Sequence, residues 1–334
     1  MSKILQVEDL VTKFYTLDGV VNAVNGVSFE LNEGETLAIV GESGSGKSVT
    51  MMSLLGLIPM PPGKIESGTA IFNSKSGQCD LLTLDPEQLR EVRGGQIGFV
   101  FQDPISTLNP ILTIGEQIAE TLIRHKGISH EEAREQTIKL LAQVGIPDPE
   151  LRYKAYPFQF SGGMRQRVVI AIAIACMPKI IIADEPTTAL DVTVQAQIIE
   201  LFKELRDALG VAVIWITHDL GVVAGLAERV LVMYGGRPVE IAPVGDLYKD
   251  PKHPYTLGLL GALPRLDAKE SKRLESIQGT PPDLLIPLKH CPFAWRCDYA
   301  FDRCWKEIPP LIKVDKQHQV ACFYDLEGGG PRNE

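Results

Sequence analysis

Eight consecutive residues, "GESGSGKS" from Gly41 to Ser48, carry the strongest chemical signal in this sequence. They match G-x-x-x-x-G-K-[ST], in which glycines let the backbone turn so that successive N–H groups point at one anion. Lys47 would reach the outer phosphates of a bound polyphosphate, and the Ser48 hydroxyl would bind Mg²⁺. A glycine-rich turn without a ligand is the plainer alternative. The sequence therefore predicts a nucleotide site made by Gly41, Ser43, Gly44, Ser45, Gly46, Lys47, Ser48 and Val49.

The elements around this turn are those that such a site needs. Thr36 to Val40 predicts a short buried strand before the turn, and an apolar-periodic helix follows Lys47. A second apolar run, Ile180 to Ala183, is typical of a strand in a parallel sheet and leads into two acids. We expect Asp184 to hold Mg²⁺ and Glu185 to polarise the attacking water as a general base. Two acids in a solvated loop are the alternative.

A third motif, Ser161-Gly162-Gly163, precedes an apolar-periodic segment, so Ser161 is predicted to cap a helix. At this stretch, "FSGGMRQR", the sequence resembles the ATP-binding-cassette ATPases, whose signature is usually written LSGGQ. The resemblance extends over about the first 250 residues and follows the family's order of motifs. Phe160 and Met164 depart from that signature.

The resemblance implies roles for further residues. Gln102, after "IGFVF", would be the glutamine that contacts the γ-phosphate and the Mg²⁺ shell. His218, in "VIWITHDL", would contact the γ-phosphate, and Asp191, in "TTALD", would belong to the loop that follows the catalytic acids. Tyr15, with Phe14 as the alternative, would stack on adenine.

The resemblance also implies partners. Two cassettes of this family close head to tail, so Ser161, Gly162 and Gly163 would serve the ATP of a second, non-identical ATPase subunit. The stretches "QDPISTLNP" and "DPKHPYTLGLLGALP" resemble the branch that imports dipeptides, oligopeptides and nickel. Membership of that branch implies two integral membrane permease subunits and an extracytoplasmic peptide-binding protein that acts through the permease. The chain would then lie peripherally on the cytoplasmic face of the cell membrane.

The pattern of apolar runs predicts the organisation of the chain. Alternating strands and helices predict the fold class α/β. The resemblance implies a P-loop NTPase (RecA-like) core with an antiparallel β subdomain and a helical subdomain at about residues 103–160. In the latter, Ser129 is a plausible helix cap with Glu132 three residues on. "RVLVMYGGRPVEIA" predicts a hairpin turned by Gly235-Gly236. We place the cassette at residues 1–250 and a proline- and cysteine-rich extension at residues 251–334.

The composition limits the classes of partner. The formal net charge of -9 argues against a protein that neutralises nucleic-acid phosphate, so we expect no nucleic-acid partner. The longest apolar run, "VVIAIAIACM", is interrupted by Pro178 and is too short to span a bilayer. The N-terminal residues lack the pattern of a secretory leader, and we therefore expect a reducing compartment in which disulfides are rare.

Four of the six cysteines lie within 32 residues of the extension, at positions 291, 297, 304 and 322. Free thiols in a small core are one interpretation. Zinc bound by four thiolates, or by three with His290 or His318, is a second, although no C-x₂₋₄-C pair occurs. We favour a 4Fe-4S cluster, which tolerates wider spacings and which some peptide-importer ATPases carry. Its ligands would be Cys291, Cys297, Cys304 and Cys322.

The combined motifs predict an ATPase subunit that powers import of dipeptides or oligopeptides. An importer for nickel or another solute is the first alternative. A soluble cassette ATPase that acts on DNA, ribosomes or iron-sulfur assembly is the second, although the interval between Lys47 and Ser161 is too short for the long coiled coils of DNA-repair relatives. A ferredoxin-like electron carrier would account for the cysteines and leave the ATP motifs without a use.

Overall fold

The computed structural model describes residues 2–75, 77–188, 190–263 and 277–332. Two predicted stretches therefore extend beyond the described residues, because "TTALD" contains Ala189 and "DPKHPYTLGLLGALP" ends at Pro264. The chain divides into two compact units. The signature unit comprises Met1–Leu5, Leu31–Thr36 and Ile71–Ile216, and the phosphate-loop unit comprises Gln6–Glu30, Leu37–Ala70 and Thr217–Glu334.

Three long strands pass along the chain from one unit into the other. They are β1 (Lys3–Thr16), β2 (Gly19–Asn32) and β4 (Gly63–Ser74), and β1 lies between β2 and β4. In the signature unit, β5 (Gly77–Asp80) pairs antiparallel with the end of β4. The helix α2 (Pro86–Val92) follows, capped by Asp85.

The central strands of the phosphate-loop unit are continuous apolar runs, because both of their faces are buried. The strand β3 pairs parallel with β9, and β9 pairs antiparallel with β10. Gly235 and Gly236 turn this hairpin with φ angles of 57° and 74°, which confirms the predicted turn. The elements are β3 (Thr36–Val40), β9 (Arg229–Tyr234), β10 (Arg237–Pro243), α1 (Lys47–Leu54), α9 (Leu220–Val223), α10 (Val244–Lys249) and α11 (Pro254–Gly261).

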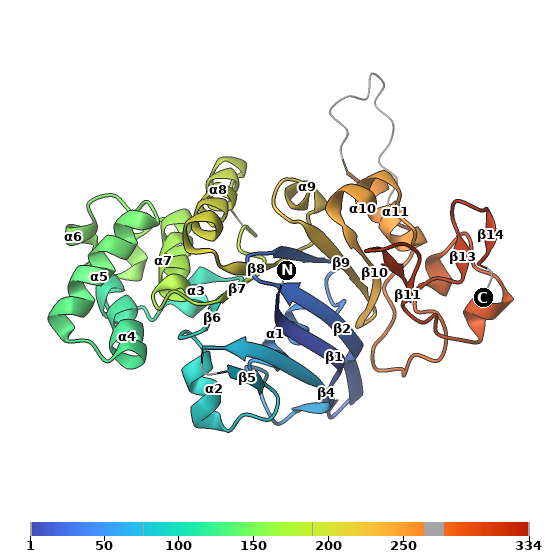
Figure 1. Cartoon of the computed structure of the whole chain (residues 1–334), viewed down its shortest axis with the longest axis horizontal. Coiled ribbons are helices and arrows are strands. Elements are labelled where there is room, and N and C mark those ends of the chain that lie inside the picture. Colours follow the sequence, from blue (N-terminus) through green and yellow to red (C-terminus); the bar gives the residue numbers. More distant parts are fainter. Residues whose placement is uncertain (1, 76, 189, 264–276, 333–334) are drawn as a thin grey trace, which may run out of the picture. The chain divides into compact units, whose positions relative to one another are not determined.

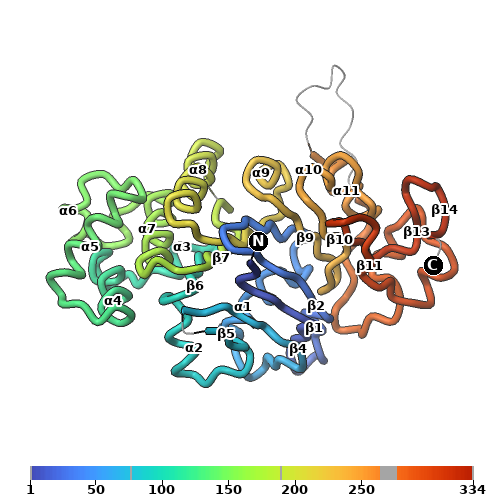
Figure 2. The backbone as a smooth tube through the Cα atoms, in the orientation of Figure 1, coloured from blue at the N-terminus to red at the C-terminus, as the bar shows by residue number. Residues whose placement is uncertain are grey.

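The extension is built onto the same unit. Its strand β12 (Gln319–Val320) pairs antiparallel with β10, and β11 (Ile312–Lys313) pairs with β12. Figure 2 shows the backbone of the extension running beside β10 and α11. Its remaining elements are short: η2 (Ala294–Arg296), η3 (Asp302–Trp305), β13 (Tyr324–Asp325) and β14 (Gly330–Pro331). Apolar residues of the extension and of β9, β10 and α11 share one buried core.

In the signature unit, β6 (Ile97–Val100), β7 (Ile180–Asp184) and β8 (Ala212–Thr217) lie parallel and in this order. The strand β6 packs closely on the helix α7, because a Cβ at Gly98 would lie 2.2 Å from the carbonyl oxygen of Ala173. The carboxyl ends of β6 and β7 therefore place Gln102 and the two acids at one edge of the sheet.

Helices alone occupy the segment between β6 and α7. Figure 1 shows α4, α5 and α6 gathered beside α7. The Ser129 hydroxyl accepts a hydrogen bond from the backbone N–H of Glu132, and the Glu132 carboxylate accepts one from the backbone N–H of Ser129, so the predicted cap is confirmed. The predicted division into residues 1–250 and 251–334 stays a prediction. The helices are α3 (Pro104–Thr107), α4 (Ile114–Lys126), α5 (His130–Gln143), α6 (Pro149–Arg152), η1 (Pro157–Gln159), α7 (Gly162–Ile174) and α8 (Val192–Leu209).

Within residues 2–75, 77–188, 190–263 and 277–332, no helix is both long and apolar enough to span a bilayer.

Candidate active site

The phosphate loop connects β3 to α1 and depends on three glycines with positive φ. These φ values are 150° at Gly41, 79° at Gly44 and 96° at Gly46. A Cβ at Gly41 would lie 2.2 Å from the Met233 carbonyl oxygen, and one at Gly46 would lie 2.5 Å from that of Ala23. At Gly44 a Cβ would meet nothing within 4 Å. Gly41 and Gly46 are therefore required by both conformation and space, whereas Gly44 is required by conformation alone.

Polar groups inside the loop fit an anionic ligand. Lys47 is buried, and its Nζ donates to the carbonyl oxygens of Gly41, at 2.8 Å, and Glu42, at 3.0 Å. The Oγ of Ser45 is buried and has no hydrogen-bond partner within the described part of the chain. A buried hydroxyl without a partner is costly, and a phosphate oxygen would accept its hydrogen bond. Ser43 is exposed, and Ser48 and Val49 are half-buried at the start of α1.

Two other predicted nucleotide contacts belong to the same unit as the loop. Tyr15 lies near the end of β1 with 49% of its surface exposed, and its hydroxyl donates to a carboxylate oxygen of Glu66. That hydrogen bond raises the pKa of the Tyr15 phenol, so the ring stays neutral. His218 is exposed immediately after β8. The predicted roles of both residues stay predictions.

The two acids that the sequence predicts to act in catalysis lie at the end of β7, in the signature unit. Asp184 is the last residue of the strand and is buried. Glu185 has a φ of 45°, a conformation that costs free energy in a non-glycine residue and is common at functional sites. One oxygen of its carboxylate accepts from Gln102 Nε2 at 3.2 Å and from Thr188 Oγ1 at 3.0 Å. The structure thus brings Gln102 and Glu185 together, and Thr188 is a contact that the sequence did not predict.

The signature motif forms the N-terminus of α7. The hydroxyl of Ser161 accepts from the backbone N–H of Met164 at 3.3 Å, which confirms the predicted cap. Gly163 allows close packing on α8, because a Cβ there would lie 2.7 Å from Val194 Cγ1. Asp191 caps α8 and accepts from the backbone N–H of Val194. Ser161, Gly162 and Asp191 are exposed, so the motif presents a helix N-terminus at the surface.

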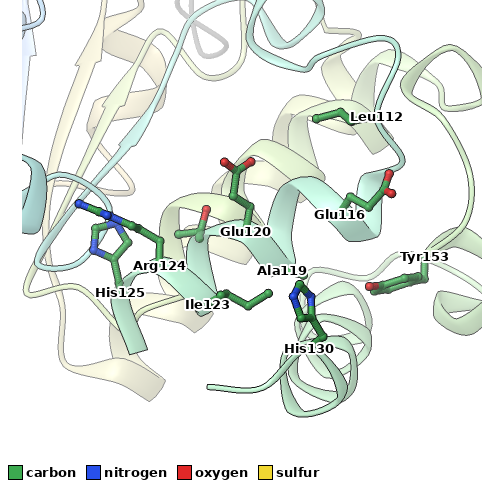
Figure 3. Close-up of a pocket in the computed structure, with 10 residues that line it drawn as sticks. Leu112, Glu116, Ala119, Glu120, Ile123, Arg124, His125, His130 and Tyr153 are labelled. Carbon is green, nitrogen blue, oxygen red and sulfur yellow. The ribbon is translucent and has the colours of Figure 1, made fainter. Parts of the chain in front are cut away.

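A pocket of about 670 Å³ opens along α4 in the signature unit. Figure 3 shows the ring of His130 beside Ala119 and Ile123, whereas Glu120 points to the other side of α4. Burial lowers the pKa of His125, so that histidine stays neutral at neutral pH. The lining is Leu112, Glu116, Ala119, Glu120, Thr121, Ile123, Arg124, His125, His130 and Tyr153.

The four cysteines of the extension converge in the described residues. Burial is the main cause that raises the pKa of Cys291 and Cys322 to about 12 and that of Cys297 to about 11. A negative charge on a neighbouring cysteine would further oppose ionisation of Cys291, Cys297 or Cys322. The sulfur of Cys322 accepts from the Tyr324 backbone N–H at 3.4 Å. No group of three or more His, Cys, Asp or Glu in the described ranges is, however, arranged as a site for a metal ion.

Similar sequences decide the family. A family model described as ABC transporter matches residues 24–188, and one described as Oligopeptide/dipeptide transporter, C-terminal region, matches residues 239–304. The oligopeptide transport ATP-binding protein OppD of Bacillus subtilis (strain 168) is 51% identical over 323 residues, which cover 97% of this chain and 89% of OppD. The chain belongs to the ABC transporter ATP-binding proteins. A second relative of this cassette, the dipeptide transport ATP-binding protein DppD of the same organism, is 52% identical over 97% of this chain and 95% of DppD.

Solved structures of ABC cassettes have the same fold. The dimeric cassette MJ0796, in a post-hydrolysis state bound to ADP and Pi, has a TM-score of 0.64 and 30% identity, covering 72% of this chain and 99% of that chain. The cbiO1 protein from Clostridium perfringens, part of the ABC transporter complex cbiONQ, has a TM-score of 0.62 and 28% identity, covering 75% and 92%. The predicted cassette fold is thereby confirmed.

Proposed function

We propose that this chain is the ATP-hydrolysing subunit of a membrane transporter that imports dipeptides or oligopeptides. The observation that carries this proposal is that one chain matches both the ABC transporter model and the oligopeptide/dipeptide transporter C-terminal region. The relatives named above, at about half identity over nearly the whole chain, are peptide transport ATP-binding proteins. An importer for nickel or another solute is the alternative within the same mechanism.

In the proposed mechanism the phosphate loop binds the triphosphate. Its backbone N–H groups and the Lys47 ammonium group bind the phosphate oxygens, and the unpaired Ser45 hydroxyl donates to one of them. Ser48, Asp184 and Gln102 would hold Mg²⁺, which neutralises charge on the phosphates. Tyr15 would stack on the adenine ring.

Glu185 is the proposed general base. Its carboxylate would take a proton from the water that attacks the γ-phosphate, while His218 would contact the γ-phosphate itself. The hydrogen bonds from Gln102 and Thr188 to one oxygen of this carboxylate hold the proposed base in place. Gln102 would thus contact the γ-phosphate and also donate a hydrogen bond to the proposed base, Glu185.

The exposed N-terminus of α7 supports pairing with a second cassette. Ser161, Gly162 and Gly163 would donate to the γ-phosphate of ATP held by a non-identical ATPase subunit, with Asp191 beside the shared interface. Because a helix N-terminus favours a negative charge, closure would depend on the intact triphosphate and would reverse after hydrolysis.

The helices between β6 and α7 are the proposed contact with two integral membrane permease subunits. Four apolar side chains in this segment are 66–79% exposed, namely Ile105, Ile111, Leu151 and Phe158. The pocket along α4 (Figure 3) is lined by residues of the same segment. Exposed apolar side chains gathered on one helical segment are typical of a protein interface. Through the permease, the chain would serve an extracytoplasmic peptide-binding protein and lie peripherally on the cytoplasmic face of the membrane.

The substitution Glu185→Gln tests the proposed base. We expect the reconstituted transporter to bind ATP as before and to lose turnover by at least about a hundredfold, because the amide cannot accept the proton. Phosphate release and binding of a fluorescent ATP analogue are the two measurements. Glu204→Gln, which removes an exposed acid from α8 of the same unit, is the matched control. Undiminished turnover in Glu185→Gln would remove Glu185 from this role.

We further propose that Cys291, Cys297, Cys304 and Cys322 bind a 4Fe-4S cluster. Their thiols act electrostatically on one another, and backbone N–H groups of Phe293, Tyr299 and Tyr324 donate to three of the sulfurs. Such hydrogen bonds to sulfur oppose the effect of burial, which raises the pKa of these thiols, and favour the thiolate form that an iron-sulfur cluster needs. A zinc ion on the same ligands is the alternative.

Metal analysis of protein purified without oxygen tests the cluster. We expect a brown protein with about four iron and four acid-labile sulfide per chain. Cys322→Ser should lower both contents, and Cys79→Ser, in β5, should leave them unchanged. One zinc per chain, or no metal, in the unaltered protein would overturn the cluster and leave the ATPase proposal intact.

A further inference from the structure

The extension contacts the phosphate loop through the side chain of Arg296. Arg296 donates from Nη1 to Oε2 of Glu42 at 2.6 Å and from Nη2 to Oε1 at 2.9 Å. Glu42 is the second residue of the loop, directly after Gly41. The Arg296 side chain is only 4% exposed and that of Glu42 is 27% exposed. This two-pronged pairing is the strongest geometry available to an arginine and a carboxylate.

The remaining N–H groups of Arg296 are also bonded. Nε donates to the carbonyl oxygen of Gln278 at 2.8 Å, Nη2 donates to that of Ile277 at 3.3 Å, and Nη1 donates to the Tyr234 hydroxyl at 3.1 Å. All five donors of the guanidinium group therefore have an acceptor. Its plane also lies over the ring of Tyr234, 5.7 Å from the centroid. These contacts restrict the Arg296 guanidinium group to one position, and the guanidinium group in turn restricts the position of the Glu42 carboxylate.

A second contact holds the backbone of the same loop residue. The N–H of Glu42 donates to the Tyr255 hydroxyl at 2.8 Å, and Tyr255 is fully buried on α11. His253 fixes that helix, because its Nδ1 accepts from the Tyr255 N–H and Pro254 occupies the first turn. The "HPYT" stretch therefore places a tyrosine against the phosphate loop.

The charge of Glu42 explains why the loop needs this contact. A carboxylate in a loop that binds a triphosphate repels the ligand, and the repulsion is strong where water is excluded. The guanidinium group of Arg296 neutralises that carboxylate and holds it in one place. The pair thereby removes a charge penalty and orders the loop before ATP arrives.

The arginine is carried by the turn between two of the clustered cysteines. Arg296 ends η2, which begins three residues after Cys291 and is followed directly by Cys297. The N–H of Cys297 donates to the Ala294 carbonyl oxygen, and Cys291 shares a buried core with Tyr234 and Tyr255. The position of the guanidinium group therefore depends on the packing of the cysteine turn.

We propose that Arg296 is a positioning residue for ATP, and that through it the affinity of the phosphate loop for nucleotide depends on the folding of the four-cysteine segment. This inference rests on the proposed function, because it concerns the same nucleotide site. Arg296 does not touch the nucleotide; it acts through Glu42.

Arg296→Met tests the positioning role. We expect the full chain to bind a non-hydrolysable ATP analogue with Mg²⁺ about tenfold more weakly, a typical size for coupling between neighbouring sites. Turnover of the reconstituted transporter at saturating ATP should stay within about twofold, because the loss lies in binding of the ground state. Arg303→Met is the matched control, since Arg303 also precedes a cysteine but pairs with Glu307. The control should bind the analogue like the unaltered chain.

Charge rescue separates positioning from a general loss of structure. In the double variant Arg296→Met, Glu42→Gln, no carboxylate remains to repel the phosphates, so affinity should return to within about threefold of the unaltered chain. A contribution to folding alone would leave the double variant as weak as Arg296→Met. That result, or unchanged affinity in Arg296→Met, would overturn the inference.

A further variant tests the dependence on the cysteine turn. Cys297→Ser should weaken binding of the analogue, and it should weaken it no further when Arg296 is already methionine, because both changes act through Glu42. Additive losses would overturn the link to the cysteine turn. Failure of the unaltered chain to bind the analogue would instead overturn the proposed function, so the two failures are distinguishable.

Discussion

The phosphate loop and the four-cysteine extension are both parts of one compact unit, yet they depend on the sequence in different ways. The loop is one run of eight residues whose chemistry lies in its own backbone, with glycines at fixed positive φ angles. The extension brings together thiols that are spread over 32 residues and touches the loop through Arg296, which lies 254 positions after Glu42. A local motif can therefore be identified without its surroundings, whereas the partner that holds it in place is visible only after folding.

Two single glycine substitutions in the phosphate loop should differ in their effect on ATP binding, and one of them should have the largest effect of all these predictions. Gly46→Ala puts a Cβ 2.5 Å from the Ala23 carbonyl oxygen, so we expect loss of detectable ATP binding. Gly44→Ala meets nothing within 4 Å and carries only the strain of its φ, about 1 kcal/mol. Titration with an ATP analogue measures both. Equal losses would mean that conformation, and not space, decides which glycines the loop requires.

The pH dependence of the free energy of unfolding tests the packing of His253 in the extension. Burial lowers the pKa of His253 to about 4, although Glu240 beside it opposes the shift. Between pH 6.5 and 4, the His253 imidazole therefore binds a proton in the unfolded chain but not in the folded chain. The free energy of unfolding should fall by about 3 kcal/mol as the pH drops from 6.5 to 4. Urea unfolding at several pH values measures this loss.

The control for that experiment keeps the helix cap. Asparagine also caps helices, so His253→Asn should unfold with a smaller acid-dependent loss than the unaltered chain. An identical pH dependence in the variant would assign the acid sensitivity to other groups.

An exposed residue of the helical segment tests contact with the permease. Ile111 is 79% exposed, so Ile111→Asp should leave folding of the chain and its binding of an ATP analogue unchanged. We expect the variant to lose most of the stimulation of ATPase activity by the permease, because a charge would be buried at the interface. Full stimulation would exclude Ile111 from that contact.

The smallest expected effect concerns a helix cap in the signature unit. Ser129→Ala removes the side chain that caps α5 and should lower the free energy of unfolding by about 1 kcal/mol, without changing ATP affinity. Thermal unfolding combined with analogue binding measures both quantities. A change in affinity would mean that the helical segment also acts on the nucleotide site.

Features that depend on neighbours in the sequence were predicted well. The predicted strand at Thr36–Val40, the hairpin at Gly235-Gly236 and the caps at Ser129 and Ser161 are all present. The strand predicted at Ile180–Ala183 is also present and extends one residue further, to Asp184. Each follows from apolar periodicity, a turn residue or a capping side chain, which act over a few residues.

Features that depend on distant segments were missed. The sequence indicated that "HPYT" was unusual, but gave no sign that Tyr255 would meet the backbone of Glu42. It did not predict that Glu240, fully buried on β10, would accept a hydrogen bond from His318 of the extension. Pairs of this kind are specified by packing of the whole unit, so only the fold identifies them. The roles of the predicted site residues stay predictions.

Peptide uptake by the reconstituted transporter tests the central claim most directly. Proteoliposomes that hold the permease, this chain, its partner ATPase and the peptide-binding protein would be supplied with labelled peptide and with ATP on the side of this chain. The account predicts ATP-dependent uptake that is lost when this chain carries Glu185→Gln and retained with Glu204→Gln. Uptake that continues undiminished with Glu185→Gln would contradict it.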